Sequence, residues 1–370
     1  MNKKLLHTPE GVRDIYGDEL ERKRYVENKL HEPLKSYGYE DIETPTFEFF
    51  DVFSKEIGTT KSNELYKFFD RENNTLVLRP DFTPSIARCA AKYYMDDTSS
   101  IRFAYKGNTF ANIGKLQGKL SENTQLGAEL IGDFSVYADA EIVSLLIKAL
   151  MNTGLKNFRV SIGNVEYFKG LCEEAGLSSD MEYELREFIS RKNYFAAAEL
   201  LENADITEYY RDVLLKAADM FGGLYSLDEA GELVKNKRSK DALKRLDELM
   251  ALLMEYGVAD RVSFDLSMLS KYNYYTGIIF KAYTYGVGDA IVTGGRYDKL
   301  LSQFGKDAAA VGFGLVVDEI LEALERENPD VFPEKEAQLK ITFNEVNFSE
   351  KLKEATSLRN EGRAVALIKE

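Results

Sequence analysis

The sequence predicts an α+β protein in which an antiparallel sheet is flanked by helices and followed by a short C-terminal α/β segment. Two observations predict this fold class. Extended apolar runs alternate with helical patterns along most of the chain, as in a sheet covered by helices. A stretch from about residue 165 to about residue 260 is almost wholly helical in pattern, which indicates a helical insertion. We therefore expect a sheet domain over residues 1–328 and a short separate segment over residues 334–370.

The first quarter of the chain is expected to form a helix, an extended segment, a hairpin and a second helix. Residues 19–36 have the amphipathic pattern of a helix, and the chain around Pro45 is extended. A hairpin is predicted at "KFFDRENNTLVLRPD", with its asparagine pair at the turn. The next helix is "TPSIARCAAKYYM", for which Thr83 is the expected N-cap.

The middle of the chain is expected to continue the sheet. "SIRFAYKGNTFA" and "ENTQLGAELIG" predict two strands joined by the loop 112–121, and residues 136–155 predict a helix. After the insertion, strands are expected at "RVSFDLSML", "YYTGIIFKAYTYG" and "DAIVTGG". Two helices should then lead to a linker at residues 329–333, and the end of the chain has a strand, helix, strand pattern.

Composition excludes several classes of function. Lys and Arg total 48 against 62 Asp and Glu, and the resulting charge of -14 disfavours nucleic acid as a partner. Two cysteines, two histidines and no CxxC spacing argue against a disulfide framework or a zinc site, so no metal or cofactor is expected. No apolar run approaches the ~20 residues of a membrane span, and the N-terminus has no apolar stretch of a signal peptide. We expect a cytoplasmic protein.

Four polar residues near strands are candidates for binding a small molecule. Asp81 and Thr83 follow a strand directly, where a carboxylate and a hydroxyl could hold an ammonium group, although they could equally cap the next helix. Gln125 and Glu129 are four apart on a strand and point to the same face, with Gly127 between them. They could recognise a small polar molecule or simply bond to each other in a half-buried sheet.

A second candidate stretch combines aromatic, cationic and glycine residues. Tyr274 and Tyr275 precede a strand, and the pair Gly294 and Gly295 permits close approach just before Arg296. This combination suits an amino-acid or nucleotide pocket, although glycine pairs more often mark turns. The loop "GKLQGK", with Lys115 and Lys119, could cradle phosphate, but it lacks a Walker pattern and is expected to be a solvated loop.

Taken in order, these stretches resemble histidyl-tRNA synthetase and its derived relative, the regulatory subunit of ATP phosphoribosyltransferase, over Thr8 to Leu324. "TPEGVRDIYGDEL" is similar to the opening of this family, and "GYEDIETPTFE" to motif 1 of the class II aminoacyl-tRNA synthetases. The other similar stretches are "FAYKGNTFA" with "TQLGAELIG" (motif 2), "YYTGIIF" with "GGRYDKL" (the histidine-specific motifs) and "AVGFGLVVDEIL" (motif 3).

The departures from the synthetase pattern fall on the residues that would handle ATP. Ala111 and Ile113 stand where motif 2 has an arginine and an acidic residue, and Glu319 stands where motif 3 ends in an arginine. Ser270 replaces the catalytic arginine, and Lys271 beside it would point to the other face of a strand. Because electrostatic stabilisation of developing charge usually contributes most to such catalysis, we expect adenylation to be lost.

The resemblance implies that a histidine pocket is largely kept. Asp81, a shorter form of the usual glutamate, lies with Thr83 and Gln125 around the amino group in this interpretation. Glu129, Tyr274 and Tyr275 surround the imidazole ring. Ser270 removes the expected partner of the carboxylate, and the sequence leaves open whether Arg296 reaches the ligand instead.

The resemblance further implies a non-catalytic regulatory subunit that binds the short-form catalytic subunit of ATP phosphoribosyltransferase. That complex is a hetero-octamer, performs the first step of histidine biosynthesis and is inhibited by histidine. The chain is expected to form a homodimer through the motif 1 region, and residues 334–370 to be a remnant of an anticodon-binding-like domain. The alternatives are an active histidyl-tRNA synthetase and a stand-alone histidine sensor.

Overall fold

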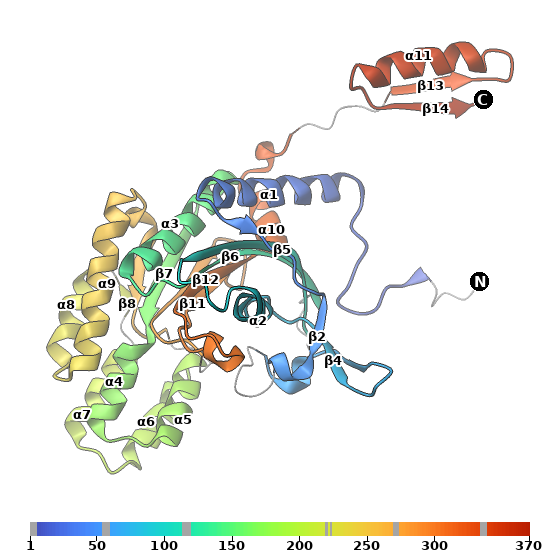
Figure 1. Cartoon of the computed structure of the whole chain (residues 1–370). Coiled ribbons are helices and arrows are strands. Elements are labelled where there is room, and N and C mark those ends of the chain that lie inside the picture. Colours follow the sequence, from blue (N-terminus) through green and yellow to red (C-terminus); the bar gives the residue numbers. More distant parts are fainter. Residues whose placement is uncertain are drawn as a thin grey trace. The chain divides into compact units, whose positions relative to one another are not determined.

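The computed structural model describes residues 6–53, 60–112, 120–218, 221–222, 224–268, 274–333 and 339–370. The chain divides into two compact units, Met1–Pro329 and Asp330–Glu370 (Figure 1). The larger unit is built on a nine-stranded sheet flanked by helices, so the predicted α+β class is confirmed. No helix among the described residues is long and apolar enough to cross a membrane.

The large sheet is antiparallel in its centre and mixed towards its sides. From one edge to the other the strands are β1 (Glu40–Asp41), β5 (Ile101–Phe110), β6 (Glu122–Ile131), β12 (Ala310–Val316), β11 (Val292–Arg296), β10 (Ile278–Thr284), β7 (Phe158–Asn164), β9 (Val262–Asp265) and β8 (Phe221–Gly222). All pairs from β5 to β7 are antiparallel, whereas β1 is parallel to β5 and β9 to β7. The predicted antiparallel sheet is therefore present in the centre, and these two outer pairs are parallel instead.

Three helices cover one face of this sheet: α1 (Gly17–Ser36), α3 (Val136–Asn152) and α10 (Val317–Glu327). Figure 1 shows them together on the side of the sheet opposite α2. The helix α3 begins where the Ser135 hydroxyl accepts a hydrogen bond from the backbone of Ala138, and most of its residues are buried. Its apolar surface therefore holds α1 and the sheet together.

The other face carries α2 (Thr83–Tyr93) and a small antiparallel sheet of β2 (Phe47–Phe49), β4 (Thr75–Leu78) and β3 (Lys67–Phe69). The predicted hairpin is present as β3 and β4, and Asn73 has a φ of 65° at its turn. The predicted N-cap is wrong: Phe82 occupies that position, and Thr83 is the first helical residue with its hydroxyl directed to Glu129. Short 3-10 turns lie at Phe50–Phe53, Ser62–Glu64 and Leu301–Phe304.

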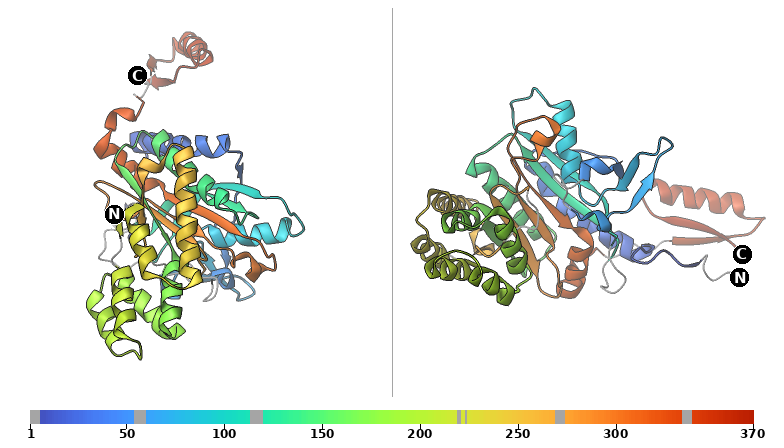
Figure 2. Two further views of the ribbon diagram at one scale, coloured as in Figure 1. Left: turned by 90° about the vertical axis from the view of Figure 1, so that its left-hand side faces the viewer. Right: turned by 90° about the horizontal axis from the view of Figure 1, so that it is seen from below.

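Among the described residues between β7 and β9, the regular structure is helical apart from the two residues of β8. Its helices are α4 (Val165–Ala175), α5 (Ser179–Ser190), α6 (Tyr194–Glu202), α7 (Glu208–Ala218), α8 (Leu224–Leu233) and α9 (Lys237–Glu255). Four of them begin at a capping side chain, supplied by Asn164, Ser178, Asn193 and Asn236. Figure 2 shows these helices gathered beside one end of the large sheet.

One central strand was not predicted from the sequence. Two helices were expected between "DAIVTGG" and residue 329, but this interval also contains β12 at residues 310–316, between β6 and β11. In this stretch Gly312 and Gly314 alternate with the buried Val311, Phe313 and Leu315. Such alternation has the period of a strand, and its glycine face is the one on which the candidate site lies.

The unit Asp330–Glu370 contains β13 (Leu339–Phe343), α11 (Phe348–Asn360) and β14 (Val365–Lys369). The strands are parallel, which requires the crossover helix that joins them. Ala355 and Val365 are buried, and the rings of Phe343 and Phe348 are 5.0 Å apart. This is the strand, helix, strand order predicted from the sequence.

Candidate functional site

The candidate site lies on the face of the large sheet that carries α2. Its floor is made of glycine backbone, because Gly312 and Gly314 of β12 lie under the side chains of the neighbouring strand β6. A Cβ on Gly312 would be 1.5 Å from Oε2 of Glu129, and one on Gly314 would be 1.8 Å from Nε2 of Gln125. Both polar side chains can therefore lie flat across β12 only because those positions are glycine.

Glu129 is the centre of the site and is held by hydroxyl groups from two other elements. Thr83, at the start of α2, donates from Oγ1 to Oε1 over 2.9 Å, and the Tyr297 hydroxyl donates to Oε2. The carboxyl group is almost completely buried, with 1% of the residue exposed. A side chain of this kind needs partners for each oxygen, and the structure provides one for each.

Burial, with a smaller contribution from the negative charge of Asp81, raises the pKa of Glu129 from 4.5 to about 8, against the lowering effect of the two hydroxyl donors. At neutral pH the group is therefore largely protonated and can donate a hydrogen bond to a neutral acceptor. A cation placed beside it would favour the ionised form instead. The protonation state of Glu129 can thus change when a ligand with an ionisable nitrogen binds.

Aromatic rings form one wall of the site. The ring centroids of Tyr274 and Tyr275 are 4.4 Å apart, and Tyr274 meets Tyr297 edge to face at 6.2 Å. The ring of Tyr275 lies against Gly295, where a Cβ would be 2.6 Å from the ring. The glycine pair recognised in the sequence therefore includes one position that makes room for this wall.

Asp81 and Gln125 complete the group. Asp81 accepts hydrogen bonds from the backbone N–H groups of Phe82 (2.7 Å) and Thr83 (3.4 Å) at the start of α2. Burial and the charge of Glu129 are the larger causes that raise the pKa of the phenols of Tyr105 and Tyr297, and the charge of Asp81 raises it in the same direction. Asp81 therefore both binds the backbone of the helix and contributes negative charge beside Glu129.

Gln125 donates from Nε2 to the buried hydroxyl of Tyr105 over 3.4 Å, and that hydroxyl donates to the carbonyl of Phe313 over 3.2 Å. The ring of Tyr105 is stacked on Phe82, with centroids 4.5 Å apart. Gln125 and Glu129 are on one face, as the sequence predicted, but they bond to different partners rather than to each other. The interpretation that they simply pair with each other finds no support.

Arg296 is not brought into this group. The register of β11 places it on the opposite face of the sheet from Gly295, towards α3. Its guanidinium group donates to Asp139, Asp298 and the backbone carbonyls before α3, and the residue is 1% exposed. The sequence-based hypothesis that Arg296 reaches a ligand is therefore at odds with its position and its hydrogen bonds.

Two residues of the site were missed from the sequence. Tyr297 was inside the quoted "GGRYDKL" stretch and follows Gly295 by two positions, so strand periodicity would have placed both on the same face. Tyr105 lies inside "FAYKGNTFA" and faces Gly127 across the β5 and β6 pair. The third omission is the glycine alternation of β12, a strand that was not predicted.

The positions that would handle ATP are only partly described. Ala111 and Asn112 follow β5, and their backbone N–H groups donate to the carbonyls of Ser121 and Glu64, each over 2.8 Å. Glu319 lies in the first turn of α10. The predictions made for five further residues stay predictions, because these residues lie outside the described ranges: Ile113, Lys115, Lys119, Ser270 and Lys271.

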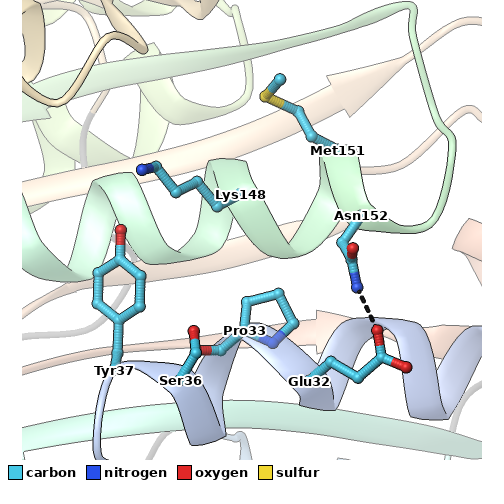
Figure 3. A pocket seen from close by; sticks show the side chains of 7 residues that line it. All are labelled: Glu32, Pro33, Ser36, Tyr37, Lys148, Met151 and Asn152. Atoms are coloured by element: carbon cyan, nitrogen blue, oxygen red, sulfur yellow. Dashed lines mark hydrogen bonds between the residues drawn. The ribbon is translucent and has the colours of Figure 1, made fainter.

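A separate hollow of about 480 Å³ lies between α1 and α3 and includes no residue of the candidate site (Figure 3). It is lined by Glu32, Pro33, Ser36, Tyr37, Lys148, Met151 and Asn152. The Asn152 amide bridges Glu32 and the carbonyl of Lys29, which ties the two helices together across the hollow. The volume is open, and Glu32 and Asn152 of its lining already bond to each other, so we assign no ligand to it.

The sequence is similar to those of known proteins over most of its length. Residues 11–320 match the sequence profile of the family described as histidyl-tRNA synthetase. A protein of Ruminiclostridium cellulolyticum named ATP phosphoribosyltransferase regulatory subunit is 38% identical over 361 residues, covering 98% of this chain and 86% of the relative.

Two solved structures share the fold. One from Bacillus halodurans, titled as an ATP phosphoribosyltransferase regulatory subunit/histidyl-tRNA synthetase, has a TM-score of 0.89 and 33% identity, with 99% of this chain and 93% of that chain covered. Histidyl-tRNA synthetase from Nostoc has a TM-score of 0.80 at 20% identity, covering 98% of this chain and 85% of that chain, and shows the fold alone. The chain therefore belongs to the family of ATP phosphoribosyltransferase regulatory subunits, within the histidyl-tRNA synthetase-like proteins.

Proposed function

We propose that this protein is the non-catalytic regulatory subunit of an ATP phosphoribosyltransferase, acting in the cytoplasm in the first step of histidine biosynthesis. In this role it is required for the activity of the short-form catalytic subunit and for feedback by histidine. The names of the relatives that match nearly the whole chain support it. The observation that carries it is a contrast inside one fold: a polar and aromatic pocket is built around Glu129, whereas Ala111 and Glu319 stand at the positions of two ATP-binding arginines.

Histidine is the ligand that we propose for the pocket. The ammonium group would lie near Asp81, Thr83 and Gln125, which offer a carboxylate, a hydroxyl and an amide oxygen. The imidazole ring would meet Glu129, Tyr274 and Tyr275. Two features support this assignment: the buried carboxyl of Glu129 suits a nitrogen that changes protonation, and the paired tyrosine rings offer a flat surface to an aromatic ring.

The assembly that we propose contains a homodimer, within a hetero-octamer with the catalytic subunit. Its support is an exposed apolar face on the small sheet, where Phe47, Phe49 and Phe68 are 52%, 55% and 37% exposed. The pairing registers place these three rings on one face with Leu76 and Leu78 of β4. A monomer rarely leaves so many adjacent large apolar side chains in water, and Phe47 of this sheet lies in the motif 1 stretch "GYEDIETPTFE".

For residues 334–370, within the short unit Asp330–Glu370, we propose a remnant of an anticodon-binding-like domain. A parallel pair of strands with one crossover helix supports this interpretation, because this unit is a building block of α/β layers. The boundaries proposed for the larger domain remain residues 1–328, with the helical insertion at about 165–260.

A stand-alone histidine sensor is the second candidate, because the same pocket would serve it without any catalytic partner. The test that separates the two is the formation of phosphoribosyl-ATP by the short catalytic subunit from the same organism, measured alone, with this protein, and with histidine added. A large rise on mixing that histidine suppresses is the expected result. An unchanged rate on mixing would reject the regulatory role, and direct titration with histidine would then test the sensor.

A further inference from the structure

A buried carboxylate, Asp139 of α3, lies between two arginines that come from distant parts of the chain. Arg296 of β11 donates from Nε to Oδ1 of Asp139 over 2.8 Å. Arg245 of α9, in the helical insertion, donates from Nε to Oδ2 over 2.6 Å. Each oxygen of the Asp139 carboxylate accepts from one arginine, and the residue is 0% exposed to solvent. A carboxylate in this environment depends strongly on both cations.

Hydrogen bonds connect Arg296 of this cluster to the backbone segments that carry the tyrosines of the candidate pocket. Arg296 also donates to Oδ1 of Asp298 over 3.0 Å, and Asp298 accepts from the Thr276 hydroxyl through its other oxygen over 2.9 Å. The backbone N–H of Thr276 in turn donates to the carbonyl of Arg296 over 2.8 Å. Tyr297, between Arg296 and Asp298, is the residue that donates to Glu129.

The tyrosine wall is connected to the same cluster, because Thr276 follows Tyr275 immediately. Arg296 and Asp298 therefore fix the backbone on both sides of the pocket: the segment that carries Tyr297 and the segment that carries Tyr274 and Tyr275. Neither charged side chain belongs to the pocket itself. Their effect on it is exerted through these backbone segments.

Arg245 connects the cluster to the helical insertion. Arg245 donates a second hydrogen bond, from Nη2 to the carbonyl of Phe134 over 2.9 Å, just before α3 begins. Both guanidinium groups lie over the exposed ring of Phe134, at 5.4 Å for Arg245 and 5.6 Å for Arg296. The helix α9 itself packs on α3 and α4.

We propose that Arg245, Asp139 and Arg296 form a clamp by which the helical insertion positions the tyrosines of the candidate pocket. The three are positioning residues: they act on a ligand through Tyr297 and the segment after Tyr275. Displacement of α9, for example by a bound partner, would loosen the carboxylate of Asp139 and shift Arg296 with it. This inference rests on the proposed function only in naming histidine as the ligand.

The first measurement is hydrogen exchange by mass spectrometry on the full chain without ligand, comparing wild type, Arg245→Gln and Arg238→Gln. Arg238 is the matched control, because it lies on the same helix and its guanidinium binds Glu166 and Glu173 instead of Asp139. We expect Arg245→Gln to increase exchange by about fivefold or more in the peptides that contain Thr276 and Tyr297, whereas Arg238→Gln leaves them unchanged. An increase confined to α3 and α9, or one that both variants share, would overturn the clamp.

Arg245→Lys serves as the conservative variant. It keeps a positive charge for Asp139 and loses the second donor, so exchange in the same peptides should fall between wild type and Arg245→Gln. If Arg245→Gln does not fold, this variant carries the test against Arg238→Lys. Equal exchange in the two lysine variants would then overturn the proposal.

Calorimetric titration with histidine is the second measurement. Weaker binding by about fivefold in Arg245→Gln, with wild-type affinity in Arg238→Gln, is expected from the clamp. Equal affinity in all three proteins would overturn it. If the wild type itself does not bind histidine, the ligand assignment of the proposed function fails, and the exchange experiment still decides whether the insertion positions the tyrosines.

Discussion

The carboxyl group of Glu129 lies across the backbone of Gly312, so close that a methyl group on Gly312 would fall 1.5 Å from Oε2. The contact joins the central strands β6 and β12, which pair at these two residues. It explains why a buried acid can lie flat on a sheet and meet hydroxyl groups from α2 and from the segment after β11. The pocket therefore depends on a residue that has no side chain.

Replacing Gly312 with alanine should remove histidine binding. The new methyl group forces the carboxyl of Glu129 away from Tyr297, and overpacking of this kind typically costs about 1–3 kcal/mol of unfolding free energy. Gly288→Ala is the matched control, because a Cβ at Gly288 meets nothing within 4 Å and its backbone angle is ordinary. Histidine titration and urea unfolding of both variants check the prediction. Unchanged histidine affinity in Gly312→Ala would contradict the assigned pocket.

The raised pKa of Glu129 predicts a specific dependence of stability on pH. The folded state holds the proton up to a pH of about 8, whereas the unfolded chain releases it near 4.5. Between these values the unfolded state binds fewer protons, so this group lowers the unfolding free energy as pH rises, by about 1.4 kcal/mol per pH unit at most. The stabilisation is thus complete at low pH and lost by about pH 8.

Glu129→Gln removes this titration while keeping the size of the side chain. We expect the difference in unfolding free energy, variant minus wild type, to increase steadily between about pH 5 and pH 8. The chain has only two histidines, so few other side chains titrate in this interval. Urea unfolding curves at several pH values check the prediction, and a constant difference across the interval would show that Glu129 is ionised in the folded protein.

Glu129→Ala should also lose histidine affinity if the pocket is the histidine site.

Much of this arrangement follows from local sequence, and the rest depends on register. The helix of residues 19–36, the hairpin and the strand of Gln125 and Glu129 were predictable because their apolar periods are regular. The strand β12 was not, since glycines at alternate positions weaken the apolar signal of a strand. Arg296 was misplaced for a related reason: its face is fixed only when β11 is known to continue through it, which puts Gly295 and Arg296 on opposite sides.

The role of Asp139 was also beyond sequence reasoning. An acidic residue in the first turn of a helix is ordinary, because its negative charge interacts favourably with the positive end of the helix dipole. Nothing local indicates that arginines more than a hundred residues further along the chain reach it. Such a contact is set by the packing of α3, α9 and the sheet together, which a pattern within one segment does not contain.

The exposed phenylalanine face predicts that a single charge should dissociate a homodimer. Phe49→Glu places a carboxylate in the middle of the apolar face of the small sheet, and burying it against a partner would be costly. Phe195→Glu is the matched control, because Phe195 is 82% exposed on α6 of the insertion. Light scattering after size exclusion should give a dimer for wild type and Phe195→Glu and a monomer for Phe49→Glu. A dimer in all three would place the interface elsewhere.

Restoring one cation should not restore adenylation. Ala111→Arg returns a guanidinium group to the end of β5, where the resemblance places the arginine that holds the ATP α-phosphate. Glu319 remains at the position of a second arginine and Ser270 at that of a third, and the carboxylate of Glu319 repels phosphate. Only one of the three cations would then stabilise the negative charge of the transition state. Loss of even one preorganised donor lowers the rate by about 10²–10³-fold. We therefore expect no AMP formation from ATP and histidine above background, with Ala111→Lys as the control for charge alone. Measurable AMP from Ala111→Arg would mean that the remaining frame still supports the chemistry, and the non-catalytic interpretation would fail with it.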